Sequence, residues 1–91
     1  MPGVKSKEVT IYTTDICPYC TAAKNLLKEK GIEYKEINVT DDDDKREWLL
    51  QKTGQRTVPQ IFFDDEPIGG YSDLADLEQK GLLQQKLRAC G

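Results

Sequence analysis

Alternating hydrophobic and polar residues predict a strand, a helix and a second strand in the N-terminal half of the chain. Residues 9–13 alternate and are rich in β-branched and aromatic side chains, which is typical of a strand. Residues 32–39 alternate in the same way, and Gly31 before them is a suitable end for a helix. Between these strands, hydrophobic residues recur at helical spacing at Tyr19, Ala22, Ala23, Leu26 and Leu27. A strand, a helix and a strand with short joints predict a βαβ unit with parallel strands and a right-handed crossover.

Four aspartates at residues 41–44 predict the start of a second helix. Thr40 and Asp43 have the spacing of a capping box, and the other carboxylates fall where the helix dipole favours negative charge. Calcium binding is the alternative, but the spacing of an EF-hand, with its glycine and final glutamate, is absent. We expect this helix to end at Gly54 and to bury two large side chains, Trp48 and Leu49.

Residues 60–63 and 66–68 predict two antiparallel strands joined by an aspartate turn. We expect a cis peptide bond before Pro59, because the Thr-Val-Pro segment lies where the chain returns toward the first helix. Such a turn exposes the backbone groups of Val58, which could pair with a peptide-like substrate as an added strand would.

Gly69 and Gly70 precede a third predicted helix, whose first residues include Ser72 and Asp73. Two glycines permit a close backbone approach, and a serine and an aspartate suit a helix N-terminus. This segment is either a plain capped turn or a small site for a carboxylate, which free N–H groups attract. We expect Leu74 and Leu77 to face inward from this helix, and Leu82, Leu83 and Leu87 to form a short closing helix.

Length and composition limit the class of protein. The 91 residues suit a single domain over residues 1–91, with 37% hydrophobic and 32% charged residues. A net charge of −3 argues against nucleic acid as a partner, and no apolar run is long enough to span a bilayer. Three cysteines are too few for a disulfide scaffold and the start lacks an apolar signal segment, so we expect a cytoplasmic monomer.

Candidate chemistry lies in Cys17-Pro18-Tyr19-Cys20, where the first strand gives way to the first helix. Pro18 suits a first helical turn, which puts Cys17 at the N-cap, facing unpaired N–H groups and the positive end of the helix dipole. That environment favours the thiolate, the attacking species in disulfide exchange. Cys20 lies close enough to attack a mixed disulfide formed on Cys17.

A metal site is the alternative for the two cysteines. The chain has no histidine and only one further cysteine, Cys90, so a four-ligand site would need carboxylates. The sequence therefore favours redox chemistry without a metal. We expect Cys90 to be an exposed thiol near the chain end, with a regulatory or dimer-forming disulfide as the alternative.

Three segments, in this order and spacing, resemble a dithiol glutaredoxin of the small bacterial type: residues 12–20, Thr57-Val58-Pro59 and residues 69–73. The resemblance extends from about Glu8 to Leu87. It implies an α/β, thioredoxin-like fold, in which a four-stranded mixed sheet is flanked by helices in the order β-α-β-α-β-β-α, followed by a short C-terminal helix. It also implies glutathione as co-substrate, with no tightly bound cofactor.

The resemblance implies that Cys17 is the nucleophile and Cys20 the resolving thiol. It further implies a glutathione-binding set consisting of Tyr19, Arg56, Thr57, Val58, Pro59, Gly70, Ser72 and Asp73. In that set, the tyrosine packs beside the mixed disulfide, and the Thr-Val-Pro backbone pairs with the cysteinyl part of glutathione. The last three residues hold its γ-glutamyl end, and the arginine could face its glycine carboxylate.

Two positions depart from the family pattern: Thr14 replaces a frequent lysine, and Tyr71 a frequent cysteine. The missing cation would have stabilised the Cys17 thiolate; Lys24 or Arg56 could compensate.

The implied function is glutathione-dependent reduction of protein disulfides and glutathione mixed disulfides. One alternative is a glutaredoxin-like protein reduced by thioredoxin reductase. The other is a dimer that binds an iron–sulfur cluster through Cys17 of each chain and two glutathiones.

Overall fold

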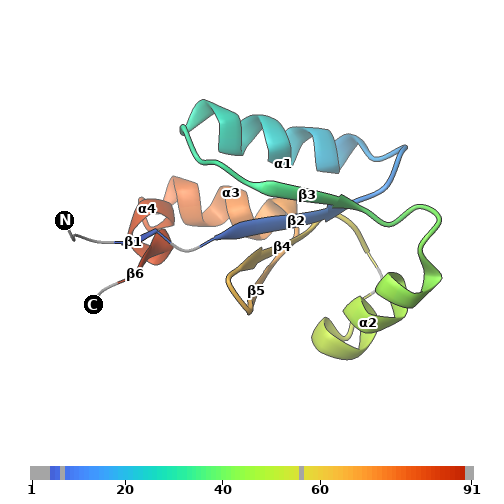
Figure 1. Cartoon of the computed structure of the whole chain (residues 1–91). Coiled ribbons are helices and arrows are strands. Elements are labelled where there is room, and N and C mark those ends of the chain that lie inside the picture. Colours follow the sequence, from blue (N-terminus) through green and yellow to red (C-terminus); the bar gives the residue numbers. More distant parts are fainter. Residues whose placement is uncertain (1–4, 7, 56, 90–91) are drawn as a thin grey trace.

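The computed structural model describes residues 5–6, 8–55 and 57–89. Within them, the order of helices and strands follows the predicted order, with one additional short strand near each end (Figure 1). The elements are β1 Lys5–Ser6, β2 Val9–Thr13, α1 Pro18–Glu29, β3 Lys35–Asn38, α2 Asp43–Thr53, β4 Gln60–Phe63, β5 Glu66–Gly69, α3 Tyr71–Gln79, α4 Leu83–Leu87 and β6 Arg88–Ala89.

A four-stranded mixed sheet in the order β3-β2-β4-β5 forms the centre of the molecule. Strand β2 runs parallel to β3 and antiparallel to β4, and β4 pairs with β5 as a hairpin. Helices α1 and α3 pack against each other on one face of the sheet, whereas α2 lies on the opposite face (Figure 1). This arrangement confirms the expected βαβ unit, the hairpin and the four-stranded mixed sheet.

Hydrophobic side chains form one cluster on each face of the sheet, because successive strand residues point to opposite faces. The larger cluster lies between the sheet and the helices α1 and α3, and contains Val9, Ile11, Ala23, Leu27, Ile32, Ile61, Phe63, Leu74 and Leu83. The smaller cluster, on the α2 side, contains Tyr12, Val39, Leu49 and Phe62. Burying a large apolar side chain stabilises a fold by roughly 1.5–3 kcal/mol, so the larger cluster dominates stability.

The predicted start of α2 is wrong by two residues. Asp42, not Thr40, is the N-cap, and its carboxylate accepts a hydrogen bond from the amide of Lys45 at 2.9 Å. The hydroxyl of Thr40 instead accepts the amide of Asp15 at 2.8 Å, so it is not available to cap the helix. The predicted end is confirmed: Gly54 has the left-handed conformation, with φ of 75°.

Trp48, which was predicted to be buried, and two other large side chains are exposed. Tyr19 is 66% exposed, and Cys20 takes the buried position at the start of the α1 stripe. Trp48 is 44% exposed, although its ring stacks on Phe62 and also contacts Tyr12. Leu82 precedes α4 and is also exposed, unlike Leu83.

Strands β1 and β6 pair antiparallel, with Lys5 opposite Ala89 and Ser6 opposite Arg88. This ribbon is separate from the central sheet and places residues 5–6 beside residues 88–89 (Figure 1). The sequence did not predict it, because two residues per strand are too few to show alternation. β3 is likewise shorter than its alternating segment of residues 32–39.

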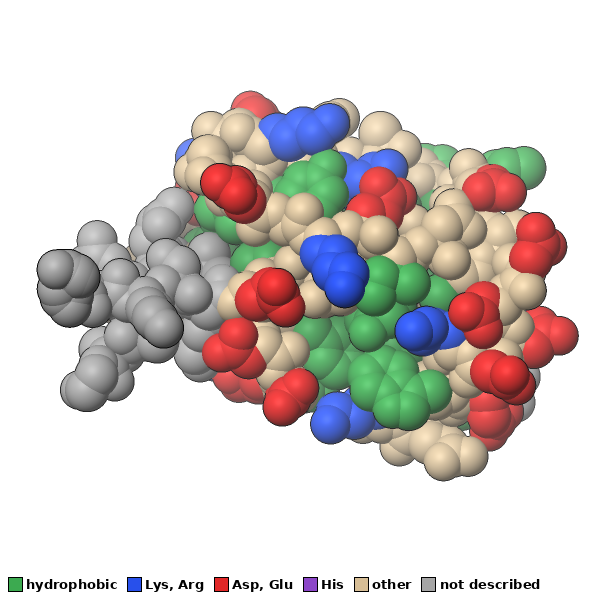
Figure 2. All heavy atoms as spheres, in the orientation of Figure 1, with side chains coloured by type: hydrophobic (Ala, Val, Ile, Leu, Met, Phe, Trp, Pro, Cys, Tyr) green, Lys and Arg blue, Asp and Glu red, His purple; other side chains and the backbone are tan. Residues whose placement is uncertain are grey.

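The face of the molecule drawn in Figure 2 carries a patch of hydrophobic side chains bordered by acidic and basic ones. The partial exposure of Trp48 fits a sheet face that α2 covers only in part. Among the helices in the described ranges, none has the length and apolar character needed to cross a bilayer.

Candidate active site

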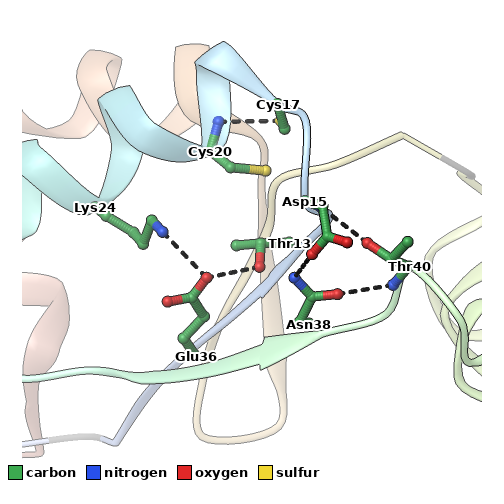
Figure 3. Close-up of polar contacts among 8 residues, drawn as sticks. All are labelled: Thr13, Asp15, Cys17, Cys20, Lys24, Glu36, Asn38 and Thr40. Atoms are coloured by element: carbon green, nitrogen blue, oxygen red, sulfur yellow. Dashed lines mark hydrogen bonds and ion pairs between the residues drawn. The ribbon is translucent and has the colours of Figure 1, made fainter.

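The start of α1 holds the Cys17 sulfur against the backbone of the helix. Cys17 is the N-cap, with an extended backbone (φ −156°, ψ 97°), and Pro18 follows as the first helical residue. The amide of Cys20 donates a hydrogen bond to the Cys17 sulfur at 3.1 Å (Figure 3). Strand, proline and helix therefore arrange the motif as predicted, with a peptide N–H directed at the sulfur.

Cys20 lies behind Cys17 and is only 2% exposed, and both residues are free thiols. Burial, together with the hydrogen bond to Cys17, raises the pKa of the Cys20 thiol to about 12. Cys20 is therefore protonated at neutral pH, and a disulfide from solution cannot reach it. Cys17, which is partly exposed, is the sulfur that can meet a substrate first.

The Thr-Val-Pro segment lies directly beside Cys17. The Cys17 thiol donates a long hydrogen bond to the carbonyl oxygen of Val58, with 3.7 Å between sulfur and oxygen. The bond between Val58 and Pro59 is cis, as predicted. Pro59 is buried, whereas Thr57 is exposed at the edge of the site, and Arg56 lies outside the described residues.

The start of α3 closes the site on a third side. Gly70 is its N-cap, and a Cβ atom there would lie 3.4 Å from the carbonyl oxygen of Pro59, so the two segments are neighbours. The carboxylate of Asp73 accepts the amide of Gly70 at 3.0 Å. Gly69 has φ of 126°, and a side chain there would overlap Asp73. The predicted capping role is thus filled by Asp73, while Ser72 is exposed on the first turn.

Two tyrosines connect the starts of α1 and α3. The rings of Tyr19 and Tyr71 lie 6.1 Å apart at an interplanar angle of 31°. Tyr71 is partly buried against the larger cluster, so the exposed Tyr19 has an anchored neighbour. The structure thereby brings Tyr19 to the same side as the start of α3.

A polar network fixes the loop that precedes Cys17 (Figure 3). Besides the bond from the Asp15 amide to Thr40, the side chain of Asn38 donates to the Asp15 carboxylate at 2.8 Å and accepts the Thr40 amide at 2.9 Å. The loop after β2 is therefore tied to the end of β3. Sequence reasoning missed this network, because its members are separated along the chain and form no motif.

A second network lies under Cys20 (Figure 3). The buried Thr13 donates its hydroxyl to Glu36 at 2.8 Å, and the Lys24 ammonium pairs with the same carboxylate oxygen at 3.1 Å. The Thr13 hydroxyl and, to a smaller extent, Lys24 lower the pKa of Glu36, and Glu36 raises the pKa of Lys24. Lys24, considered above as a replacement for the family lysine, is thus held by Glu36.

A cavity of about 400 Å³ lies between α2 and Val58. Its lining is mixed, with hydrophobic and charged side chains: Val39, Asp43, Arg46, Glu47, Leu49, Leu50 and Val58. One of these residues, Val58, has its carbonyl oxygen 3.7 Å from the Cys17 sulfur. No group of three or more potential metal-binding side chains occurs within the described part of the chain.

Disulfide exchange needs a thiol that a substrate can reach, and resolving the mixed disulfide within the protein needs a second thiol close behind it. The start of α1 supplies both. The class of protein is therefore a thiol–disulfide oxidoreductase. Comparison with known proteins gives the family, since the family model described as glutaredoxin matches residues 9–68. The chain belongs to the glutaredoxin family.

Individual relatives agree with this assignment. Glutaredoxin 3 of Escherichia coli is 44% identical over 80 residues, which cover 88% of this chain and 96% of that protein. The solution structure of glutaredoxin from Brucella melitensis matches with a TM-score of 0.85 and 40% identity, covering 97% of this chain and 95% of that one. A buckwheat glutaredoxin–glutathione complex matches with a TM-score of 0.83 and 31% identity, covering 89% of this chain and 76% of that one. These matches confirm the thioredoxin-like fold.

Proposed function

We propose that this glutaredoxin reduces protein disulfides and mixed disulfides between proteins and glutathione, with glutathione as its reductant. The observation that carries the proposal is the position of the Cys17 sulfur, which meets the amide of Cys20 at 3.1 Å and the carbonyl of Val58 at 3.7 Å. The buckwheat glutaredoxin–glutathione complex, whose chain has the same fold, supports glutathione as the ligand.

In the proposed reaction, the Cys17 thiolate attacks the glutathione sulfur of the mixed disulfide. The Cys17–glutathione bond forms as the protein–glutathione bond breaks, and the protein leaves as a thiolate that takes a proton from solvent. A second glutathione thiolate then attacks the glutathione held on Cys17, which releases glutathione disulfide and restores Cys17. The protein is reduced and glutathione is oxidised, so electrons balance.

Protein disulfides require the second thiol. Cys17 attacks one sulfur of the substrate and forms a mixed disulfide with it. Cys20 then attacks Cys17, so that the Cys17–Cys20 bond forms and the substrate leaves with both sulfurs reduced. Two glutathiones reduce the Cys17–Cys20 disulfide and leave as glutathione disulfide.

The groups around Cys17 suit the three parts of glutathione. The Val58 backbone would pair with the cysteinyl part as an added strand does, with Thr57 and Pro59 flanking it. The first turn of α3, with Gly70, Ser72 and Asp73, would bind the charged γ-glutamyl end. Tyr19 would cover the mixed disulfide, and Arg56 would face the glycine carboxylate. Because the reaction consumes reduced glutathione, we propose that the protein acts in the cytoplasm. We further propose that it acts as a monomer.

A comparison of reductants tests the proposal. The substrate is a glutathionylated peptide, and NADPH consumption is followed with glutathione plus glutathione reductase or, separately, with thioredoxin reductase alone. We expect turnover only with the first set. Turnover with thioredoxin reductase alone would support the alternative, a glutaredoxin-like protein reduced by thioredoxin reductase. Thr14, in place of the family lysine, leaves this alternative open. Absence of turnover with either set would contradict both.

A further inference from the structure

Lys24 is a charged residue near Cys20, the buried thiol that reacts in the second step of the proposed reaction. We propose that the Lys24 ammonium, held in place by Glu36 and Thr13, promotes the attack of Cys20 on Cys17 by stabilising the Cys20 thiolate. This inference rests on the proposed function, because it concerns the resolving step of that reaction. Lys24 touches neither reacting sulfur, so its role is that of a positioning residue that acts through Cys20.

The helix places Lys24 beside Cys20. The two residues are four apart in α1, and residues at this spacing lie above one another on one face of a helix. Cys20, Ala23 and Leu27 form the buried face of α1, and Lys24 borders this face with its side chain only 26% exposed. The Lys24 stem therefore runs along the sheet side of the helix rather than into solvent.

The sheet then fixes the end of the Lys24 side chain. In the parallel register Glu36 lies opposite Ile11, whose side chain belongs to the cluster under α1, so Glu36 points to the same side. Thr13, two residues after Ile11 on that face, donates to Glu36 at 2.8 Å. Glu36 in turn holds the Lys24 ammonium at 3.1 Å. Thr13 is fully buried, so this chain of contacts begins at a rigid point.

Cys20 needs a nearby cation because it must lose its proton in a place that water hardly reaches. Its burial is the main factor that raises the pKa of the thiol, and the hydrogen bond to Cys17 raises it further. Two groups act in the opposite direction, namely the backbone of Thr14 and the charge of Lys24. Only the second of these can be removed by a side-chain substitution.

The step itself is a simple exchange. The Cys20 thiolate attacks Cys17 of the mixed disulfide, the Cys17–Cys20 bond forms, and the glutathione or substrate sulfur leaves with the electron pair. Cys20 gives its proton to solvent, and the leaving thiolate takes one proton from solvent. No further oxidant or reductant takes part. The rate at neutral pH depends on the fraction of Cys20 present as thiolate, which a nearby positive charge increases.

Two variants that break the same ion pair provide the test, in a chain with Cys90 replaced by serine. Lys24→Gln removes the cation and leaves the carboxylate, whereas Glu36→Gln removes the carboxylate and leaves the cation. The glutamine oxygen can still accept the Thr13 hydroxyl. Lys24→Arg keeps the charge, and Lys30→Gln is the matched control, because Lys30 ends the same helix in an ion pair with Glu78 at 2.7 Å.

The measurement follows the single turnover of reduced protein with glutathione disulfide, stopped by acid and analysed by mass. Its two phases are the appearance of the Cys17–glutathione adduct and its conversion to the Cys17–Cys20 disulfide. We expect Lys24→Gln to slow the conversion about three- to tenfold, because a smaller fraction of Cys20 is present as thiolate. The slowing is limited because a thiolate of higher pKa is intrinsically more nucleophilic. Lys24→Arg should stay within about twofold. Glu36→Gln should be unchanged or faster, because the glutamine oxygen can still accept a hydrogen bond from Lys24 while the opposing negative charge is removed. Lys30→Gln should leave both phases unchanged.

Equal slowing by Lys24→Gln and Glu36→Gln would overturn the inference, because it would mean that the ion pair acts only through structure. Unchanged conversion in Lys24→Gln would overturn it as well. Unfolding by urea, measured for each variant, identifies any loss of fold. If no adduct forms on Cys17 in the parent protein, the proposed function fails at its first step. That outcome is distinct from an adduct that forms and resolves independently of Lys24.

Discussion

The carbonyl oxygen of Val58 lies 3.7 Å from the Cys17 sulfur, although the two residues are 41 positions apart in the chain. The register of the sheet explains this meeting. Tyr12, near the end of β2, is opposite Gln60, the first residue of β4, and the two strands run antiparallel. The loop that leaves β2 and the segment that enters β4 therefore lie at the same end of the sheet. The site depends on this strand pair as much as on the cysteine motif.

The two cysteines should differ in what their loss removes. Cys17→Ser should reduce turnover of every disulfide substrate to the uncatalysed background, because no other described thiol is exposed to substrate. Cys20→Ser should retain turnover of glutathionylated peptides within about threefold, since that reaction needs only one thiol. Coupled NADPH consumption with a glutathionylated peptide measures both. Substantial turnover by Cys17→Ser would contradict the assigned roles.

Asp73 should have separable effects on stability and on glutathione binding. Asp73→Ala removes the acceptor of the Gly70 amide and should lower the free energy of unfolding by about 1 kcal/mol. It should also raise the KM for glutathione about tenfold, because a charge-assisted contact is lost. Asp73→Asn keeps an acceptor oxygen but not the charge. It should therefore restore stability without restoring KM, as measured by urea unfolding and steady-state kinetics.

Glu36 should make stability depend on pH in the acid range. The Thr13 hydroxyl and Lys24 lower the pKa of its carboxyl below the ordinary 4.5, so the unfolded chain binds more protons there. The stabilisation is present above pH 4.5 and is lost as the pH falls through the lowered pKa. It should stay below about 1 kcal/mol, because water screens a partly exposed ion pair.

Urea unfolding of the parent protein and of Glu36→Gln between pH 3 and pH 7 measures this effect. The difference in unfolding free energy should shrink as the pH falls. A difference that is constant over this range would show that the charge of Glu36 does not contribute. Lys80→Gln, which removes an exposed pair with Asp76, is a suitable comparison.

Thr40 should control the stability of the loop before Cys17. Thr40→Val removes the acceptor of the Asp15 amide with little change in shape, and Thr40→Ser retains a hydroxyl. In Thr40→Val, protection of the Asp15 amide from hydrogen exchange should fall about five- to tenfold, the equivalent of one hydrogen bond. Protection in Thr40→Ser should stay close to that of the parent. Equal exchange in all three proteins would mean that this bond does not hold the loop.

Much of the fold could be predicted because its signals are local. The alternation of β2, the proline at the start of α1 and the glycine after α2 each act within a few residues. Thr40 was misassigned for the opposite reason: capping chemistry at Thr40 competes with the Asp15 amide, 25 residues away. Burial of Trp48 also depended on how closely α2 covers the sheet, which its own sequence does not specify.

The candidate site divides in the same way. Cys17 and Cys20 could be identified from the sequence, because proline and helix lie next to them in the chain. The contact from Thr13 to Glu36 could not be predicted, because it depends on the register of two parallel strands. The alternating pattern fixes which side chains share a face, but a shift of the register by two residues would keep the same faces. The residues that support a reactive group are thus harder to predict than the group itself.

Trp48 stacks on Phe62 with ring centres 5.8 Å apart and also contacts Tyr12, yet 44% of it faces solvent. It is the only tryptophan in the chain. The tryptophan fluorescence of the protein therefore originates at one spot, on the helix that forms a wall of the cavity beside Val58. Any event that shifts this helix would change the colour or intensity of the emitted light, so the molecule carries its own optical reporter close to where disulfides are exchanged.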